Sequence, residues 1–87
     1  MKIIKKKIWP EYFDLVASGK KNYELRLNDF EIQEGDILLL QEWNPETKEY
    51  TGREVEKKVT YVGKFKLDYF GQEEEIKEKG MQVISLE

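Results

Sequence analysis

The residues best suited to chemistry lie together in the segment from Gly19 to Arg26. Within it, Lys21, Glu24 and Arg26 supply an ammonium, a carboxylate and a guanidinium. A lysine acts as a base or nucleophile only after losing its proton, which burial or a second cation such as Arg26 favours. The guanidinium offers a rigid fork of donors that fits a phosphate or a carboxylate. The same charges could instead form surface ion pairs, worth under about 1 kcal/mol each.

The composition excludes several kinds of chemistry. The chain has 87 residues and contains no Cys and no His. Disulfides, thiolate nucleophiles, Cys-ligated zinc and a Ser-His-Asp triad are therefore ruled out. Any metal would need carboxylate ligands, which suit Mg²⁺ or Ca²⁺. Because no Asp-rich loop is present to hold such an ion, we expect no metal and no other cofactor.

Length and charge favour a single domain over residues 1–87. A chain this short buries about 60–65% of the surface that its unfolded form exposes, which allows one modest core. Charged residues make up 38% of the chain, but an aromatic content of 13% argues against disorder. No stretch resembles a signal peptide or approaches the roughly 20 apolar residues of a membrane helix. We therefore expect a cytoplasmic protein with no membrane partner.

Two local elements must position the charged segment. Residues 10–18 predict a short helix, because Pro10 suits a first helical turn and apolar residues recur at helical spacing. Gly19 follows as a natural stop. Residues 22–27 alternate with the period of a strand. This alternation predicts one apolar face and one exposed polar face, the first formed by Tyr23, Leu25 and Leu27 and the second by Asn22, Glu24 and Arg26.

The rest of the chain predicts more strands joined by turns. Ile37 to Leu40 form the most apolar run, which is too short for a helix and suits a central buried strand. Residues 73–79 could form a short helix. Further strands are predicted at 2–8, 53–62 and 81–86, a turn at 44–47, and a turn or bulge at Thr51-Gly52. Such a small antiparallel or mixed sheet avoids exposed edges by curling or by closing into a barrel.

The octet reads Gly-x-Lys-x-x-Glu-x-Arg, with Gly19, Lys21, Glu24 and Arg26 in place, and it resembles the signature of the ASCH domains of the PUA-like superfamily. The wider text resembles small, mostly uncharacterised ASCH-like proteins of bacteria and their phages, and the resemblance covers roughly residues 3–86. It rests on Ile8 to Phe13, Gly35 to Leu38, Glu42 to Pro45, and Tyr50 to Arg53. It implies an α+β fold, a PUA-like small β-barrel with one prominent helix after the first strand.

The resemblance also implies binding of RNA, or of a modified nucleoside or nucleotide, in a cleft beside the octet. The residues expected at the ligand are Gly19, Lys20, Lys21, Glu24, Arg26, Trp43, Tyr50 and Arg53. Trp43 and Tyr50 could stack a base or could simply pack in a hairpin. Arg53 could contact a phosphate or be an exposed hairpin residue. Trp9 is more typical of a core, although it could also stack a base.

Two alternatives stay open. Some small bacterial relatives are amidohydrolases that remove the acyl group from N4-acylated cytidine with the motif Lys, a Thr and a downstream Glu. Lys21 matches that Lys, Glu24 occupies the position of the Thr, and either Glu42 or Glu54 could be the downstream Glu. In an enzyme, Lys21 would activate water or the nucleophile, and Glu24 or Glu42 would move the proton. The other alternative is a protein-interaction domain whose charged patch contacts another protein.

Overall fold

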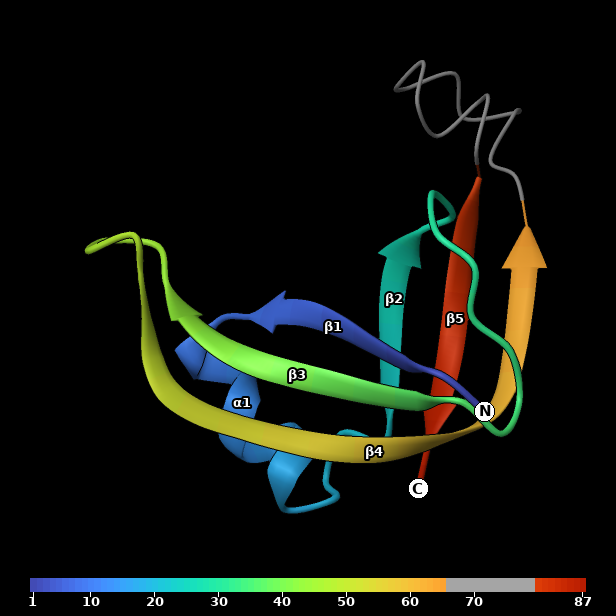
Figure 1. The fold of residues 1–87 in the computed structure, drawn as a ribbon, viewed down its shortest axis with the longest axis horizontal. Helices are drawn as coiled ribbons and strands as arrows, with labels where there is room; N and C mark the ends of the chain where they lie inside the picture. Colours follow the sequence, from blue (N-terminus) through green and yellow to red (C-terminus); the bar gives the residue numbers. More distant parts are fainter. Residues whose placement is uncertain (66–79) are drawn as a thin grey trace.

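A computed structural model describes residues 1–65 and 80–87 and shows one curved mixed sheet with a short helix (Figure 1). In chain order the elements are β1 (Ile3–Ile8), α1 (Pro10–Ala17), β2 (Tyr23–Leu27), β3 (Ile37–Asn44), β4 (Glu49–Phe65) and β5 (Met81–Leu86). The strands lie in the order β1-β3-β4-β5-β2. The β1–β3 pair is parallel, and the other neighbouring pairs are antiparallel. The fold is therefore mostly strand.

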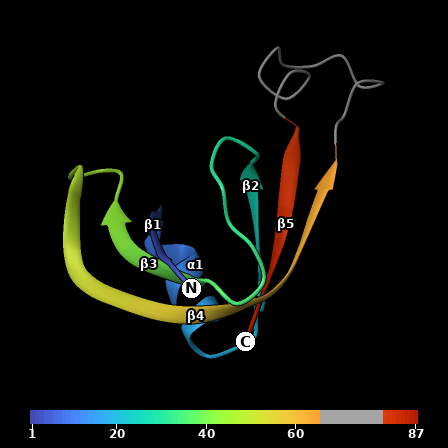
Figure 2. The same cartoon turned by 45° about the vertical axis from the view of Figure 1, so that its right-hand side comes forward.

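The long strand β4 belongs to both halves of the sheet and carries its bend. Residues 49–58 of β4 pair with β3, and residues 59–65 pair with β5. The β4–β5 register also shifts between Val59 and Tyr61. Bends and bulges of this kind let one strand pass between two differently oriented sheets. As a result, β1 and β3 run across the direction of β5 and β2, as two views of the ribbon show (Figures 1 and 2).

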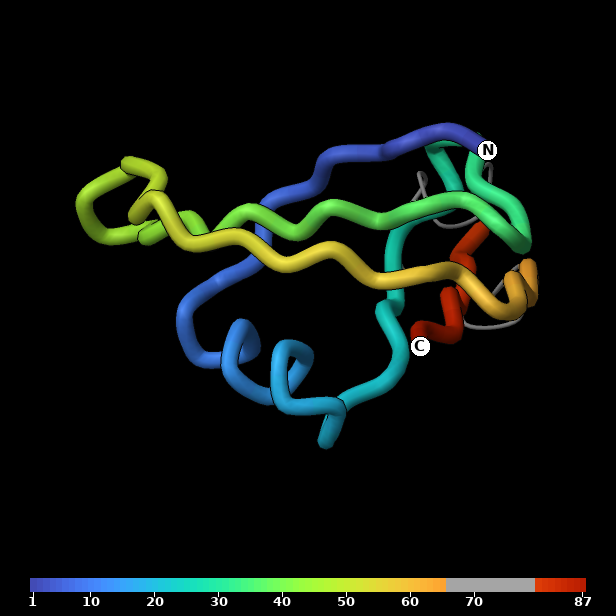
Figure 3. The backbone as a smooth tube through the Cα atoms, turned by 60° about the horizontal axis from the view of Figure 1, so that its bottom comes forward, coloured from blue at the N-terminus to red at the C-terminus, as the bar shows by residue number. Residues whose placement is uncertain are grey.

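The core lies inside this bend and is covered by α1 and by the loop between β2 and β3. Phe13 and Val16 of the helix and Ile32 of the loop meet the buried strand residues Ile8, Leu38, Leu40, Val59, Ile84 and Leu86. The backbone tube shows α1 on one side of the strands, between the end of β1 and the start of β2 (Figure 3). Because the helix has only eight residues, packing rather than intrinsic propensity stabilises it.

The sheet is open, so the expected small β-barrel is wrong. The outer strands are β1 and β2, and no strand pairing joins them within residues 1–65 and 80–87. In place of a ladder, the Arg26 guanidinium donates a hydrogen bond to the Lys7 carbonyl oxygen at 2.6 Å. The helix and the loop already cover the core at this opening. Burial of the core therefore does not require the two outer strands to pair.

The two faces of β2 are the reverse of the sequence expectation. Glu24 is only 4% exposed, whereas Tyr23 and Leu25 are 47% and 52% exposed. Strand pairing explains the reversal, because Glu24 lies opposite the fully buried Ile84 of β5. Residues directly opposite each other in a sheet share a face. The alternation was predicted correctly, but alternation alone does not say which face meets the core.

Most other expected elements are confirmed within the described residues. The helix, the strand at the start of the chain and the last strand lie where the sequence placed them. The bulge expected at Thr51-Gly52 is present, since the β3–β4 register shifts opposite it and Gly52 has a φ of +96°. The possible helix at 73–79 lies outside the described residues. In the part of the chain that the structure describes, no helix is long and apolar enough to cross a membrane.

Asp36 fastens the start of β3 to the start of β1 and to the preceding loop. Its carboxylate accepts hydrogen bonds from the backbone N–H groups of Lys2 at 3.2 Å and Gln33 at 3.0 Å. Burial by itself would raise the pKa of this carboxyl group. The two N–H donors and the charge of Lys2 outweigh burial and hold the Asp36 pKa below its ordinary value of 3.8. The ionised carboxylate therefore stabilises the folded state.

We expect Asp36→Asn to lower the free energy of unfolding at neutral pH, because an amide offers one acceptor oxygen for two N–H donors. The folded-state pKa lies below the unfolded-state value, so this stabilisation is present above about pH 4 and is lost as the pH falls further. Urea denaturation of both proteins across a pH series measures the difference, which should shrink below about pH 4. The exposed Glu31→Gln serves as the control, and a pH-independent difference contradicts the assignment.

Candidate functional site

The charged residues of the octet meet at the opening between β1 and β2. Glu24 lies at the centre, with its Oε1 3.3 Å from Lys21 Nζ and its Oε2 2.9 Å from Arg26 Nε. The Glu24 side chain is 5% exposed, whereas the Lys21 and Arg26 side chains are 23% and 25% exposed. An unpaired carboxylate would be costly to bury here. The two cations satisfy both of its oxygens and leave one net positive charge in the cluster.

The end of α1 delivers Lys21 to this cluster. Gly19 has a φ of +86°, a left-handed conformation that residues with a side chain rarely adopt. Its N–H donates to the Val16 carbonyl oxygen at 3.1 Å, and the Lys21 N–H donates to the Leu15 carbonyl oxygen at 2.9 Å. These bonds close the helix and fix the backbone of Lys21 beside β2. The glycine of the octet therefore positions the lysine.

A cleft of about 510 Å³ lies over the cluster. On one side it is lined by β2, and on the other by the end of β1, the β1–α1 connection and the first turn of α1. The lining residues are Lys7, Ile8, Trp9, Tyr12, Lys21, Tyr23, Glu24, Leu25 and Arg26. Sites for small ligands usually have volumes of about 300–1,000 Å³. The cleft is therefore large enough for a ligand the size of a nucleotide.

Three half-exposed aromatic rings, those of Trp9, Tyr12 and Tyr23, line the cleft at 48%, 43% and 47% exposure. The Lys21 ammonium lies 4.9 Å from the centre of the Tyr12 ring and 5.4 Å from that of Tyr23. Cation–π attraction thus helps to hold Lys21 between the two rings. Tyr12 was not expected at the site, because it stands next to the core residue Phe13 in a helical pattern. Tyr23 was expected on an apolar face away from the motif charges.

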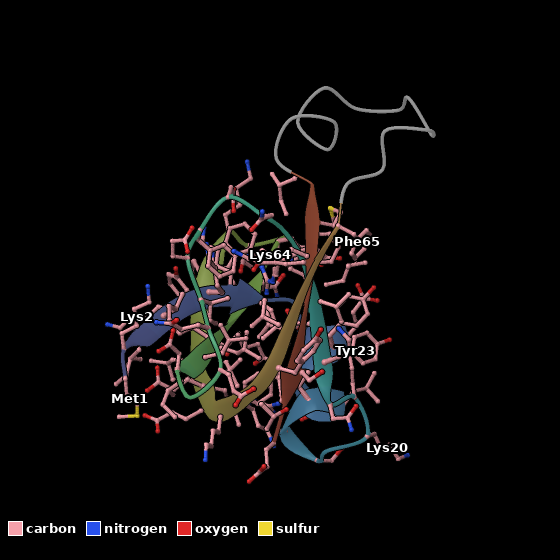
Figure 4. The ribbon with its side chains drawn as sticks, turned by 90° about the vertical axis from the view of Figure 1, so that its right-hand side faces the viewer. Met1, Lys2, Lys20, Tyr23, Lys64 and Phe65 are labelled. Carbon is pink, nitrogen blue, oxygen red and sulfur yellow. The ribbon has the colours of Figure 1, made fainter. Side chains whose placement is uncertain are left out.

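The other two residues expected from the octet lie beside the cleft. Lys20 lines a smaller groove with Leu15, and this groove shares Tyr12, Lys21 and Tyr23 with the cleft. Gly19 lines another hollow, which shares Lys21 with the cleft. A side view shows Tyr23 at the start of β2 and Lys20 after the end of α1, both directed outward (Figure 4). Lys20 therefore extends the positive charge along the surface next to the cleft.

Glu42 and Arg53, two residues expected at the ligand or in catalysis, instead connect the β4 bulge to α1. Glu42 accepts a hydrogen bond from Thr51 Oγ1 at 2.6 Å, and its Oε1 lies 3.4 Å from Arg53 Nε. Arg53 also donates to Asp14 at 2.6 Å and stacks over the Phe13 ring at 4.3 Å. Neither residue lines the cleft. Their contacts hold the helix against the sheet.

Trp43 and Tyr50 also lie outside the lining of the cleft. They face each other across the β3–β4 pair. The Lys7 ammonium lies over both rings, at 4.4 Å from the centre of Trp43 and 5.8 Å from that of Tyr50. Glu54, the other candidate for a downstream catalytic Glu, is exposed and accepts a hydrogen bond from Gln41 at 3.4 Å. The structure thus places the charged octet residues Lys21, Glu24 and Arg26 at the cleft. It leaves the expected residues of β3 and β4 outside the lining of the cleft.

Fold and site together define a small open mixed-sheet domain with a charged, aromatic-lined cleft between its outer strands. The chain belongs to the family described as domain of unknown function DUF3850, whose model matches residues 3–76. An uncharacterized 12.9 kDa protein from the GpA 3′ region of Escherichia phage P2 is 44% identical over 61 residues. That match covers 70% of this chain and 54% of the phage protein, so it spans about half of that relative's length.

The fold also has a counterpart among solved structures. The crystal structure of hypothetical protein PH0355 is similar with a TM-score of 0.73, covering 100% of this chain and 98% of the other. The two sequences are 23% identical, so the similarity establishes a shared fold and nothing about activity. The relatives of this chain include a phage protein.

We expect Glu24→Gln to destabilise the fold by about 1–3 kcal/mol, because it leaves two partly buried cations without their countercharge. Urea denaturation at neutral pH measures this loss. The exposed Glu31→Gln is the matched control and should stay within about 0.5 kcal/mol of the wild type. Equal effects of the two substitutions would contradict the central place of Glu24 in the cluster.

Proposed function

We propose that this protein binds RNA, or a modified nucleoside or nucleotide, with one nucleotide unit in the cleft between β1 and β2. The observation that carries the proposal is the combination of net positive charge and exposed aromatic rings in one cleft. Lys21 and Arg26 share a single carboxylate, and three rings line the same space. Phosphate is bound by cations, and bases stack on aromatic rings whatever their sequence.

Each group of the cleft then has a distinct part in binding. Lys21 directs one of its three donors to Glu24, which leaves donors for a phosphate or a carbonyl oxygen. Arg26 is held by Glu24 and by the Lys7 carbonyl oxygen, so its guanidinium plane is fixed before a ligand arrives. Such preorganisation lowers the entropic cost of binding. Because both Glu24 oxygens already accept hydrogen bonds, its part is to orient the two cations.

We also propose that the chain is an ASCH-like domain of the PUA-like superfamily. The support is the octet itself, since its glycine, lysine, glutamate and arginine have connected parts in one site. Gly19 positions Lys21 through the helix end, and Glu24 joins Lys21 to Arg26. The four motif residues lie together and position one another. This makes the resemblance to the ASCH signature more specific than a match between residues that lie far apart in the structure.

Substitution of the cations provides the test of binding. We expect Lys21→Ala and Arg26→Ala each to weaken binding of a short single-stranded RNA and of nucleoside 5′-monophosphates by about tenfold, and to reduce the salt dependence of RNA binding. Fluorescence of Trp9 in a Trp43→Phe background measures binding at the cleft. The exposed Lys58→Ala removes the same charge elsewhere and should leave affinity unchanged. Equal affinities of all variants would refute the proposal.

An amidohydrolase acting on an acylated nucleoside is the second candidate, because Lys21 and Glu24 lie 3.3 Å apart in the cleft, close enough for a proton to pass between them. Water would add to the acyl carbon, the C–N bond would break, and the products would be a carboxylic acid and the free amino group of the base. Glu42 and Glu54 do not line the cleft, so Glu24 would have to move the proton.

The amidohydrolase hypothesis predicts that the protein releases cytidine from N4-acetylcytidine, which chromatography measures. Lys21→Ala should lower the rate of release by at least about a hundredfold. Lys58→Ala should retain the full rate. Absence of turnover across a panel of acylated nucleosides would leave the binding function and exclude this one. Absence of both turnover and nucleotide binding would favour the protein-interaction domain instead.

A further inference from the structure

The open edge of β2 presents backbone groups to the cleft. Among the described residues, β2 pairs with β5 on one side and with no strand on the other. The Leu86 N–H donates to the Asn22 carbonyl oxygen at 2.8 Å, and the Asn28 N–H donates to the Gly80 carbonyl oxygen at 2.9 Å. These two bonds show which residues of the strand are bonded to β5, because bonded and non-bonded pairs alternate in an antiparallel ladder.

The alternation assigns each peptide group of β2 to one side. Glu24 and Arg26 are an even number of residues from Asn22, so their N–H and C=O groups point to β5. Tyr23 and Leu25 therefore direct their N–H and C=O groups to the open edge. No backbone hydrogen bond to Tyr23 or Leu25 occurs outside the strand ladders of the described residues. Tyr23 and Leu25 both line the cleft, so these open-edge groups lie at its wall.

The shape of the opening restricts what can use this edge. Exposed strand edges commonly pair with another strand. Here the bond from Arg26 to the Lys7 carbonyl oxygen crosses from β2 to β1, and a strand added along β2 would meet it. A planar ring opposite Leu25 needs much less of the edge. The geometry therefore favours a small flat group over an extended peptide.

We propose that the N–H and C=O groups of Leu25 recognise the hydrogen-bonding edge of a nucleobase, an inference that rests on the proposed nucleotide-binding function. Each nucleobase carries a donor and an acceptor next to each other on its Watson–Crick edge, which proteins read in unpaired bases. A residue on an open strand edge offers the complementary donor and acceptor, which would otherwise pair with a neighbouring strand. Lys21 and Arg26 then bind the phosphate, while Leu25 distinguishes a base with a free edge from one whose edge is blocked.

Paired ligands test this inference independently of any substitution. The probes are the 5′-monophosphates of uridine, cytidine, adenosine and guanosine, each against its analogue methylated at the donor nitrogens of that edge. A methylated base still stacks but cannot donate its hydrogen bond. We expect at least one pair to show about a tenfold preference for the unmethylated nucleotide, as the loss of one hydrogen bond at a preformed site produces. Equal affinities within all four pairs would overturn the inference and leave nucleotide binding intact.

A proline substitution tests the backbone donor itself. Leu25→Pro removes one N–H that takes no part in the β2–β5 ladder, and proline is tolerated at such edge positions. We expect this variant to lose the preference for the unmethylated nucleotide while it still binds ribose 5-phosphate. Leu25→Ala shortens the same side chain but keeps the N–H, so it should keep the preference ratio. Retention of the ratio in a folded Leu25→Pro protein would overturn the inference.

Two further outcomes separate the inference from the function beneath it. If Leu25→Pro does not fold, as circular dichroism would show, the four ligand pairs decide the question alone. If the wild type binds none of the nucleotides, the proposed function fails and the inference fails with it. Binding of nucleotides without discrimination within the pairs refutes only the part assigned to Leu25.

Discussion

The two ion pairs of the buried Glu24 carboxylate are the interactions on which the rest of the candidate site depends. The carboxylate joins Lys21, which follows the helix, to Arg26, which reaches the end of β1. One side chain thus links the helix end and both outer strands. Without the carboxylate, two cations would repel each other at the opening, and without the cations a buried charge would be left unpaired. The Glu24, Lys21 and Arg26 side chains therefore stabilise the fold and also shape the candidate site.

A second charged cluster, centred on Arg53, connects the sheet to the helix and lies outside the lining of the cleft. Arg53 joins the β4 bulge to Glu42 and to Asp14 of α1, and it packs on Phe13 of the core. Since α1 carries Tyr12 and ends at Gly19, any movement of the helix would shift both a ring of the cleft and the lysine. The contacts of Arg53 thus join the sheet to the helix that precedes Lys21.

The sequence predicted local features well and their three-dimensional relations less well. Pro10 and Gly19 bounded the helix, and the octet located the charged cluster, because both depend on short-range backbone and side-chain chemistry. Which face of β2 meets the core depends on which residue of β5 lies opposite Glu24. Trp43 lies outside the lining of the cleft because of the order of the strands in the sheet. Neither the pairing nor the order is encoded in the spacing of residues along one strand. The expectation of a closed barrel was wrong for the same reason, since a barrel closes only if the outer strands β1 and β2 pair with each other.

The open sheet leaves the edge of β2 available to the proposed site. In a closed barrel, the N–H and C=O groups of Tyr23 and Leu25 would be used in a ladder with the neighbouring strand. Here, within residues 1–65 and 80–87, the Arg26 side chain reaches from β2 to the Lys7 carbonyl oxygen of β1 in place of a strand ladder, and the helix covers the core beside these strands. The peptide groups of β2, the cations of the octet and the rings of α1 and β2 therefore face the same space. An incomplete sheet leaves open the hydrogen-bonding edge, and the octet supplies the charge beside it.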